Sequence, residues 1–78
     1  MTSEATKELR TNYKYICFRT DSQNREQYVC MSRSRPAYLG RCWYYKPWKC
    51  WTFEASGAAV WSQDCLEHVV DFLKQLNS

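Results

Sequence analysis

Apolar and polar residues alternate along the first half of this chain and change to a helical spacing near its end. Alternation covers residues 12–20 and again 28–33, and a polar segment with turn-forming residues separates them at 21–27. A period of two is typical of half-buried strands, and such a polar segment predicts a hairpin loop. Pro36 ends the second strand, because proline cannot donate to a sheet ladder. In the first strand we expect two faces, one with Ile16 and Phe18 and one with Tyr13, Tyr15 and Cys17.

An aromatic stretch from Leu39 to Phe53 predicts a second hairpin. It holds three of the four tryptophans, and its interior breaker, Lys46-Pro47, places the turn near 46–48. A two-residue turn at 46–47 pairs positions that sum to 93, and a turn at 47–48 pairs positions that sum to 95. Both registers give the same two faces. One face takes Cys42, Tyr44, Trp51 and Phe53, and the other takes Leu39, Arg41, Trp43, Tyr45, Cys50 and Thr52.

Gly40 lies on the Phe53 face in either register. A glycine weakens a strand unless a neighbour needs its space, so we interpret it as room for an aromatic ring.

Helical spacing covers residues 63–76. The main apolar stripe is predicted to be Leu66, Val69, Val70, Leu73 and Leu76, widened by Cys65 and Phe72. Ser62 is a good N-cap, and Asp64 in the first turn favours the helix dipole.

These elements predict an α+β fold, with a four-stranded antiparallel sheet in the order ββββα and one C-terminal amphipathic helix packed on one face. We expect residues 1–11 to be a flexible N-terminal tail and residues 12–78 to be a single domain. A core this small contributes only roughly 3–5 kcal/mol. No apolar run is long enough to span a membrane, and the charged N-terminus lacks a signal-peptide core, so we expect a cytoplasmic protein.

The five cysteines and the single histidine give no metal or catalytic motif. Cys17, Cys30, Cys42, Cys50 and Cys65 are too far apart for a zinc knuckle, and an odd count indicates reduced thiols that pack as small hydrophobes. His68 is predicted to be a surface or boundary residue. We therefore expect no metal, no cofactor and no enzymatic activity.

Charge is distributed unevenly along the chain. Residues 10–49 hold nine basic and two acidic residues, a net charge of +7, and residues 50–78 hold one basic and four acidic residues, a net charge of −3. The sheet is thus basic, and one face of its second hairpin would expose aromatic residues beside cations. This combination is typical of protein-binding hot spots and of single-stranded nucleic-acid binding. The predicted binding residues are Arg41, Trp43, Tyr45, Lys46 and Trp48.

The run from Leu39 to Phe53, followed by Ser62-Gln63-Asp64-Cys65-Leu66 and Asp71-Phe72-Leu73, resembles a pattern in short proteins encoded by bacteriophages and prophages. Those proteins have a Leu-Gly strand, a Trp-Tyr pair, a further tryptophan, an aromatic-x-Phe strand and a Cys-Leu…Phe-Leu helix. The resemblance covers residues 38–76 and implies a phage origin and a bacterial host cytoplasm, without any catalytic residue. Cys42 stands where an aliphatic residue is more usual.

Our leading hypothesis is a phage accessory protein that binds and modulates a host bacterial protein, such as a defence or gene-expression component. A single-stranded nucleic-acid-binding protein is the first alternative. A homodimer that buries the aromatic face is the second.

Overall fold

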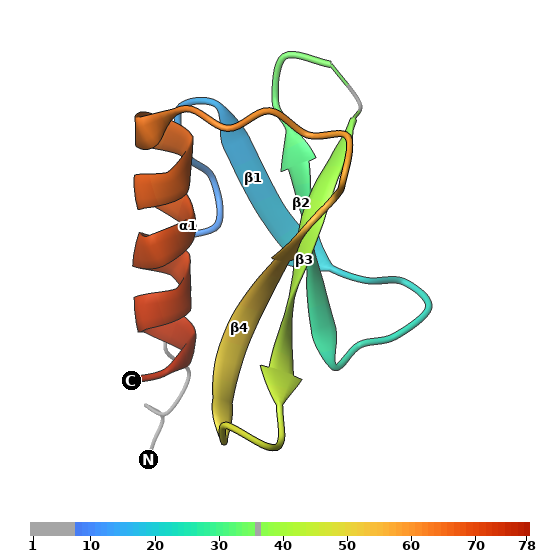
Figure 1. Cartoon of the computed structure of the whole chain (residues 1–78), viewed down its shortest axis with the longest axis vertical. Coiled ribbons are helices and arrows are strands. Elements are labelled where there is room, and N and C mark those ends of the chain that lie inside the picture. The colour runs from blue at the N-terminus through green and yellow to red at the C-terminus, as the bar shows by residue number, and fades with distance from the viewer. Residues whose placement is uncertain (1–7, 36) are drawn as a thin grey trace.

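The computed structural model describes residues 8–35 and 37–78 and has the predicted α+β architecture. Four antiparallel strands form one sheet in the order β1-β2-β3-β4, and a helix follows them (Figure 1). The elements are β1 (Ile16–Thr20), β2 (Gln27–Ser32), β3 (Tyr38–Tyr45), β4 (Cys50–Ala55) and α1 (Gln63–Leu76). We call the sheet face beneath α1 the covered face and the opposite one the open face.

The β3–β4 hairpin has the register that sums to 95, with Cys42 opposite Phe53 and Tyr44 opposite Trp51. Its turn is longer than the predicted two residues. The ladder ends at the pair Tyr45 and Cys50, and the carbonyl of Tyr45 accepts hydrogen bonds from the amides of both Trp48 and Lys49. The predicted faces of the paired residues are nevertheless correct, because a longer turn around the same centre leaves their pairing unchanged.

Leu39 is an exception, and its predicted position on the open face is wrong. Met31 pairs with Tyr38 but Cys30 pairs with Gly40, so Leu39 is a bulge residue without a partner on β2. A bulge adds one residue and re-aims its side chain. Leu39 packs instead against the core on the covered face.

The core lies between the covered face and α1. Phe18 and Phe72 stack with their ring centroids 4.1 Å apart, and the Tyr28 ring meets Phe72 edge-on at 5.2 Å. The buried apolar residues are Tyr13, Ile16, Phe18, Cys30, Cys42, Val69 and Phe72. Two cysteines therefore occupy the centre of the sheet as small apolar side chains, as the odd cysteine count indicated.

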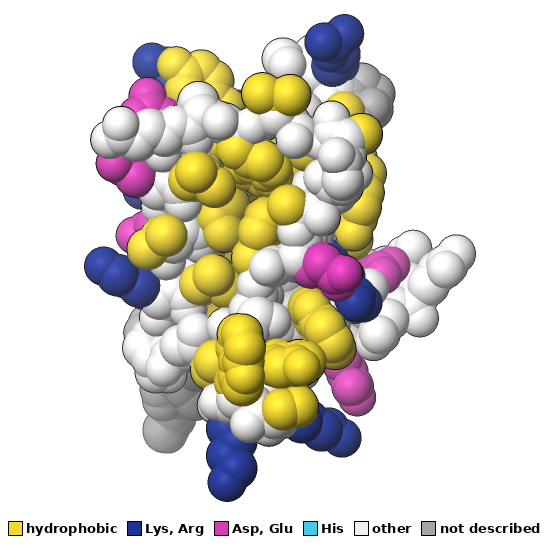
Figure 2. All heavy atoms as spheres, viewed as in Figure 1, with side chains coloured by type: hydrophobic (Ala, Val, Ile, Leu, Met, Phe, Trp, Pro, Cys, Tyr) yellow, Lys and Arg dark blue, Asp and Glu magenta, His cyan; other side chains and the backbone are white. Residues whose placement is uncertain are grey.

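Helix α1 has the predicted bounds and cap, since the Ser62 hydroxyl accepts a hydrogen bond from the amide of Cys65. Its buried face is rotated from the prediction. Leu66 and Val70, assigned to the main stripe, are 48% and 50% exposed, and Phe72 is fully buried. Exposed apolar side chains gather between α1 and β4 on this side of the molecule (Figure 2).

The N-terminal segment explains this rotation. The Tyr13 hydroxyl donates a 2.7 Å hydrogen bond to Asp71 and accepts one of 2.9 Å from Gln75, and both residues lie outside the predicted apolar stripe of α1. Tyr13 itself precedes β1 and is buried, whereas the sequence pattern placed it on the face away from Ile16. Its backbone turns back, with the Tyr13 amide donating to the Ile16 carbonyl, so strand alternation does not apply to it.

A tail was predicted over residues 1–11, and its positions 1–7 lie outside the described residues. Its last residues contact the domain, and for them the prediction is wrong. Leu9 packs against the core, the Arg10 amide donates to Gln75 at 2.7 Å, and the Thr11 carbonyl accepts from Phe18. Polar backbone groups here are paired with α1 and β1, which is why a segment without periodicity is ordered.

We expect Tyr13→Phe to destabilise the domain by about 1 kcal/mol, because it removes the hydroxyl that joins Asp71 and Gln75 while keeping the ring. Thermal melting should show a fall in Tm of roughly 4–8 °C. Tyr15→Phe is the matched control, since Tyr15 is 44% exposed. Equal melting of the two variants would contradict the role given to the Tyr13 hydroxyl.

Candidate functional site

The open face carries a connected group of side chains near the turn of the β3–β4 hairpin. The Arg41 guanidinium lies 4.3 Å from the centre of the Trp43 ring. Trp43 meets Tyr45 edge-on at 5.5 Å, and Tyr45 meets Trp48 edge-on at 5.0 Å. Four of the five predicted binding residues therefore each contact the next one in space. We call Arg41, Trp43, Tyr45 and Trp48 the aromatic cluster. Figure 2 shows apolar side chains at this end of the hairpin, with Lys and Arg side chains projecting beyond them.

Two partners that sequence reasoning missed hold Arg41 in place. Its guanidinium forms an ion pair of 2.7 Å with Glu54 on β4 and donates a 3.0 Å hydrogen bond to Gln27 on β2. Glu54 is opposite Arg41 in the register that sums to 95, so the hairpin pattern contained this signal. The contact between Arg41 and Gln27 depends on the register between β2 and β3, which could not be predicted from the sequence. Arg41 is thus paired with Glu54 and hydrogen-bonded to Gln27, and these contacts hold its planar group over Trp43.

Lys46, the fifth predicted residue, lies outside the cluster. It is exposed on the turn and lines a groove of about 570 Å³ together with the edge of β3. We call this space the edge groove; among its lining residues are Arg25, Tyr28, Trp43, Tyr44, Lys46 and Trp51. Trp48 is 70% exposed and is the cluster residue most available to a partner.

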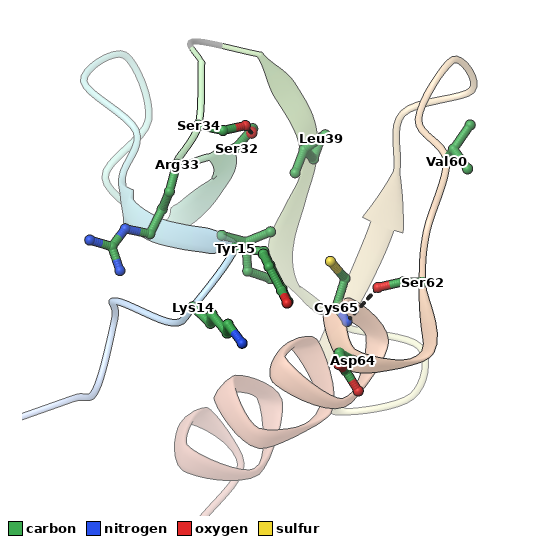
Figure 3. A pocket seen from close by; sticks show the side chains of 11 residues that line it. Lys14, Tyr15, Ser32, Arg33, Ser34, Leu39, Val60, Ser62, Asp64 and Cys65 are labelled. Atoms are coloured by element: carbon green, nitrogen blue, oxygen red, sulfur yellow. Dashed lines mark hydrogen bonds between the residues drawn. The ribbon is translucent and has the colours of Figure 1, made fainter.

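A second hollow, of about 730 Å³, lies where α1 begins, beside the end of β2 and the segment before β1 (Figure 3). Cys65 directs its sulfur into it, and Arg33 turns its guanidinium away. Arg33 donates instead to the Tyr13 carbonyl at 2.7 Å.

All five cysteines are free thiols. Burial raises the pKa of the Cys30 thiol, and likewise that of Cys42, from 9.0 to about 12. Both thiols are therefore protonated at neutral pH and unreactive. Across residues 8–35 and 37–78, no three His, Cys, Asp or Glu side chains are grouped so as to hold a metal ion.

Comparisons with protein-family profiles, curated proteins and solved structures each found no match to this chain. Within the described part of the chain, no helix has the length and apolar character needed to cross a membrane. The candidate site therefore has to be interpreted from its own geometry.

Proposed function

We propose that this chain is a non-enzymatic binding protein that contacts a protein partner through the aromatic cluster. The observation that carries the proposal is the fixed arrangement of Arg41 with three contacting aromatic rings on the open face. Aromatic residues and arginine dominate the binding energy of protein interfaces, especially where the free protein already holds them in position. The ion pair with Glu54 supplies that fixation.

The same geometry favours a protein over single-stranded nucleic acid. Stacking of bases needs free ring faces spread along a groove, whereas these rings meet one another edge to face, and Arg41 covers one face of Trp43. Phosphate binding needs available cations, and Arg41, the cation of the aromatic cluster, is already paired with Glu54. The resemblance to phage-encoded proteins supports a host bacterial protein as the partner, encountered in the bacterial cytoplasm.

We expect Trp48→Ala to abolish capture of this partner from bacterial lysate, with affinity reduced at least about thirtyfold, because a hot-spot residue is worth roughly 2 kcal/mol or more. The fold should survive, since Trp48 is 70% exposed. The measurement is affinity capture with nuclease treatment, followed by mass spectrometry and titration of the identified protein. Tyr15→Ala, which removes an exposed aromatic side chain away from the cluster, is the control.

Two results would contradict the proposal. Capture that disappears when the lysate is treated with nuclease would indicate nucleic acid. Sedimentation of the purified protein as a dimer that Trp48→Ala dissociates would indicate that a second copy of this chain occupies the face.

A further inference from the structure

The outer edge of β4 is open from Phe53 to Ala55. The Asn77 side chain accepts from the Trp51 amide at 2.7 Å and donates to the Trp51 carbonyl at 3.2 Å, so the main-chain groups of Trp51 point away from β3. Every second residue of a strand points these groups to the same side, so those of Phe53 and Ala55 also point outward. Within the described part of the chain, no residue bonds to these two amides and two carbonyls. Unpaired groups in this arrangement are a template for one further strand.

Apolar side chains of α1 lie exposed beside this edge. Tyr13 occupies the flank of α1 that carries Asp71 and Gln75. Leu66 and Val70, one helical turn apart, lie on the opposite flank, and each is about half exposed. Helix α1 packs against β4, and Figure 2 shows apolar side chains gathered between these two elements. A strand added to β4 would cover this apolar surface with the side chains that it directs to the covered face.

On the open face, the same edge borders the aromatic cluster. A hollow of about 230 Å³ is lined by the cluster residues Trp43, Tyr45 and Trp48 and by Thr52, Phe53 and Glu54 of β4. Residues that are directly opposite each other in a sheet share a face, so a residue opposite Thr52 on an added strand would point to the open face beside this hollow. The open edge and the cluster are therefore parts of one continuous surface.

Glu54 gives this edge a preference for positive charge. It is exposed between Phe53 and Ala55, and its two contacts with Arg41, of 2.9 and 2.7 Å, are both made by Oε1. Its other oxygen, Oε2, accepts no hydrogen bond from the described residues. A residue opposite Glu54 on an added strand occupies a non-hydrogen-bonded position, where facing side chains are closest and opposite charges are favourable.

This charge argues against two other occupants of the edge. Two-fold pairing with a second copy that uses both open residues aligns Phe53 of one copy with Ala55 of the other, and it places Glu54 directly opposite the same residue of the second copy. Like charges at such a position are destabilising. Phosphate groups are disfavoured for the same reason, because residues 50–78, which contain β4 and α1, hold one basic and four acidic residues, a net charge of −3.

We propose that the protein partner presents an extended segment with an apolar, a basic and an apolar residue in succession, which pairs with β4 from Phe53 to Ala55. Its lysine or arginine meets Glu54 on the open face, and its apolar residues face Leu66 and Val70 on the covered face. The residue that follows points to the hollow beside the aromatic cluster. This inference rests on the proposed function, because it names the part of the same partner that lies next to the cluster.

The test is a two-dimensional NMR titration of the isotopically labelled protein, which detects weak binding and reports on each amide. The first peptide has the core Val-Lys-Val-Leu between Gly-Ser flanks, in the order that pairs antiparallel with β4, and the second has Gln in place of Lys. The protein variants are Glu54→Gln and a matched control, Glu26→Gln, which removes an exposed carboxylate from the loop before β2. Both variants change the net charge by the same amount.

The Lys peptide should shift the amide signals of Phe53 and Ala55 and slow the exchange of these amides with solvent, because both become hydrogen-bonded. It should bind at least about threefold more tightly than the Gln peptide. This ratio should fall below about 1.5-fold in Glu54→Gln and stay unchanged in Glu26→Gln. A ratio of two peptides on one variant cancels any general weakening that the substitution causes, so it isolates the pair of charges.

Main-chain pairing is tested with two N-methylated forms of the Lys peptide. In an antiparallel pair, the peptide residue opposite Phe53 bonds to β4, whereas the residue opposite Glu54 directs its amide away from β4. Methylation of the first amide should weaken binding at least about tenfold, and methylation of the lysine amide less than about twofold.

Four results would overturn the inference. The first is an absence of shifts at Phe53 and Ala55 with millimolar Lys peptide, and the second is equal binding of the Lys and Gln peptides or an equal ratio in Glu54→Gln and Glu26→Gln. Equal losses for the two N-methylated peptides would exclude strand pairing. Sedimentation of the free protein as a dimer whose Phe53 and Ala55 amides are already protected from exchange would assign the edge to a second copy.

The aromatic cluster is tested separately by Trp48→Ala with the captured partner. A partner that needs Trp48 but leaves the exchange of the Phe53 and Ala55 amides unchanged therefore keeps the proposed function standing and removes this inference.

Discussion

Gly40→Ala should destabilise the domain by about 3 kcal/mol, because there is no space for a methyl group at this position. A Cβ atom on Gly40 would lie 2.6 Å from the Glu54 carbonyl oxygen and 2.6 Å from the tip of the Phe53 ring. The carbonyl belongs to the paired strand and cannot move without disturbing the ladder. For a domain with roughly 3–5 kcal/mol of stability, urea denaturation should show a largely unfolded protein or a midpoint near zero denaturant.

Gly57→Ala is the matched control, since a Cβ there meets nothing within 4 Å. It should leave the free energy of unfolding within about 0.5 kcal/mol of the parent value. Adding Phe53→Leu separates the two contacts of Gly40. If the ring is the main obstacle, Gly40→Ala should cost less in the Phe53→Leu background. A Gly40→Ala protein as stable as the parent would show that β3 and β4 are farther apart than described.

The Gly40 and Phe53 contact could be predicted from the sequence because it depends on the local register of one hairpin. The turn at Pro47 and the alternation around it fixed which residues share a face, and a change in turn length left those faces intact. Helix α1 was predictable for a similar reason. Its cap, its first-turn acid and its period all lie within a few residues of one another.

The predictions that failed depend on contacts between distant segments. Tyr13 is buried because it reaches Asp71 and Gln75, more than fifty residues later, and these contacts also rotate α1 so that Leu66 is exposed. The bulge at Leu39 exists only in the pairing of β2 with β3. No local pattern contains this information, so tertiary packing overrides the strand and helix periods at these positions.

The candidate site shows the same division. Arg41, Trp43 and Tyr45 could be placed together because they alternate along one strand, and Trp48 is close to them through the turn. Lys46 was grouped with them by sequence proximity, but it leaves the ladder and lines the edge groove instead. The groove itself could not be predicted, since it lies where β3 continues to Tyr45 beyond its last pair with β2, Gln27 with Trp43.

Raising the pH from 8 to 10 should destabilise the domain by about 3 kcal/mol through the two buried thiols, because each contributes roughly 1.4 kcal/mol per pH unit above its unfolded pKa. Burial raises the pKa of Cys30 and of Cys42 from 9.0 to about 12, so the folded protein keeps both thiols protonated. The unfolded chain releases those protons near pH 9. This stabilisation is therefore complete below pH 9 and is lost as the pH rises towards 12.

Tyr13 acts in the same direction at higher pH. Burial, followed by its hydrogen bond to Asp71, raises the pKa of its hydroxyl above 10.0, so its contribution is present below pH 10 and falls above it. Urea denaturation at several pH values, under reductant and without oxygen, measures the sum. A variant with Cys30→Ala and Cys42→Ala is less stable at neutral pH, but its stability should fall far less between pH 8 and 10. If the free energy of unfolding of that variant falls as steeply between pH 8 and 10 as that of the parent, groups other than these two thiols cause the loss of stability at alkaline pH.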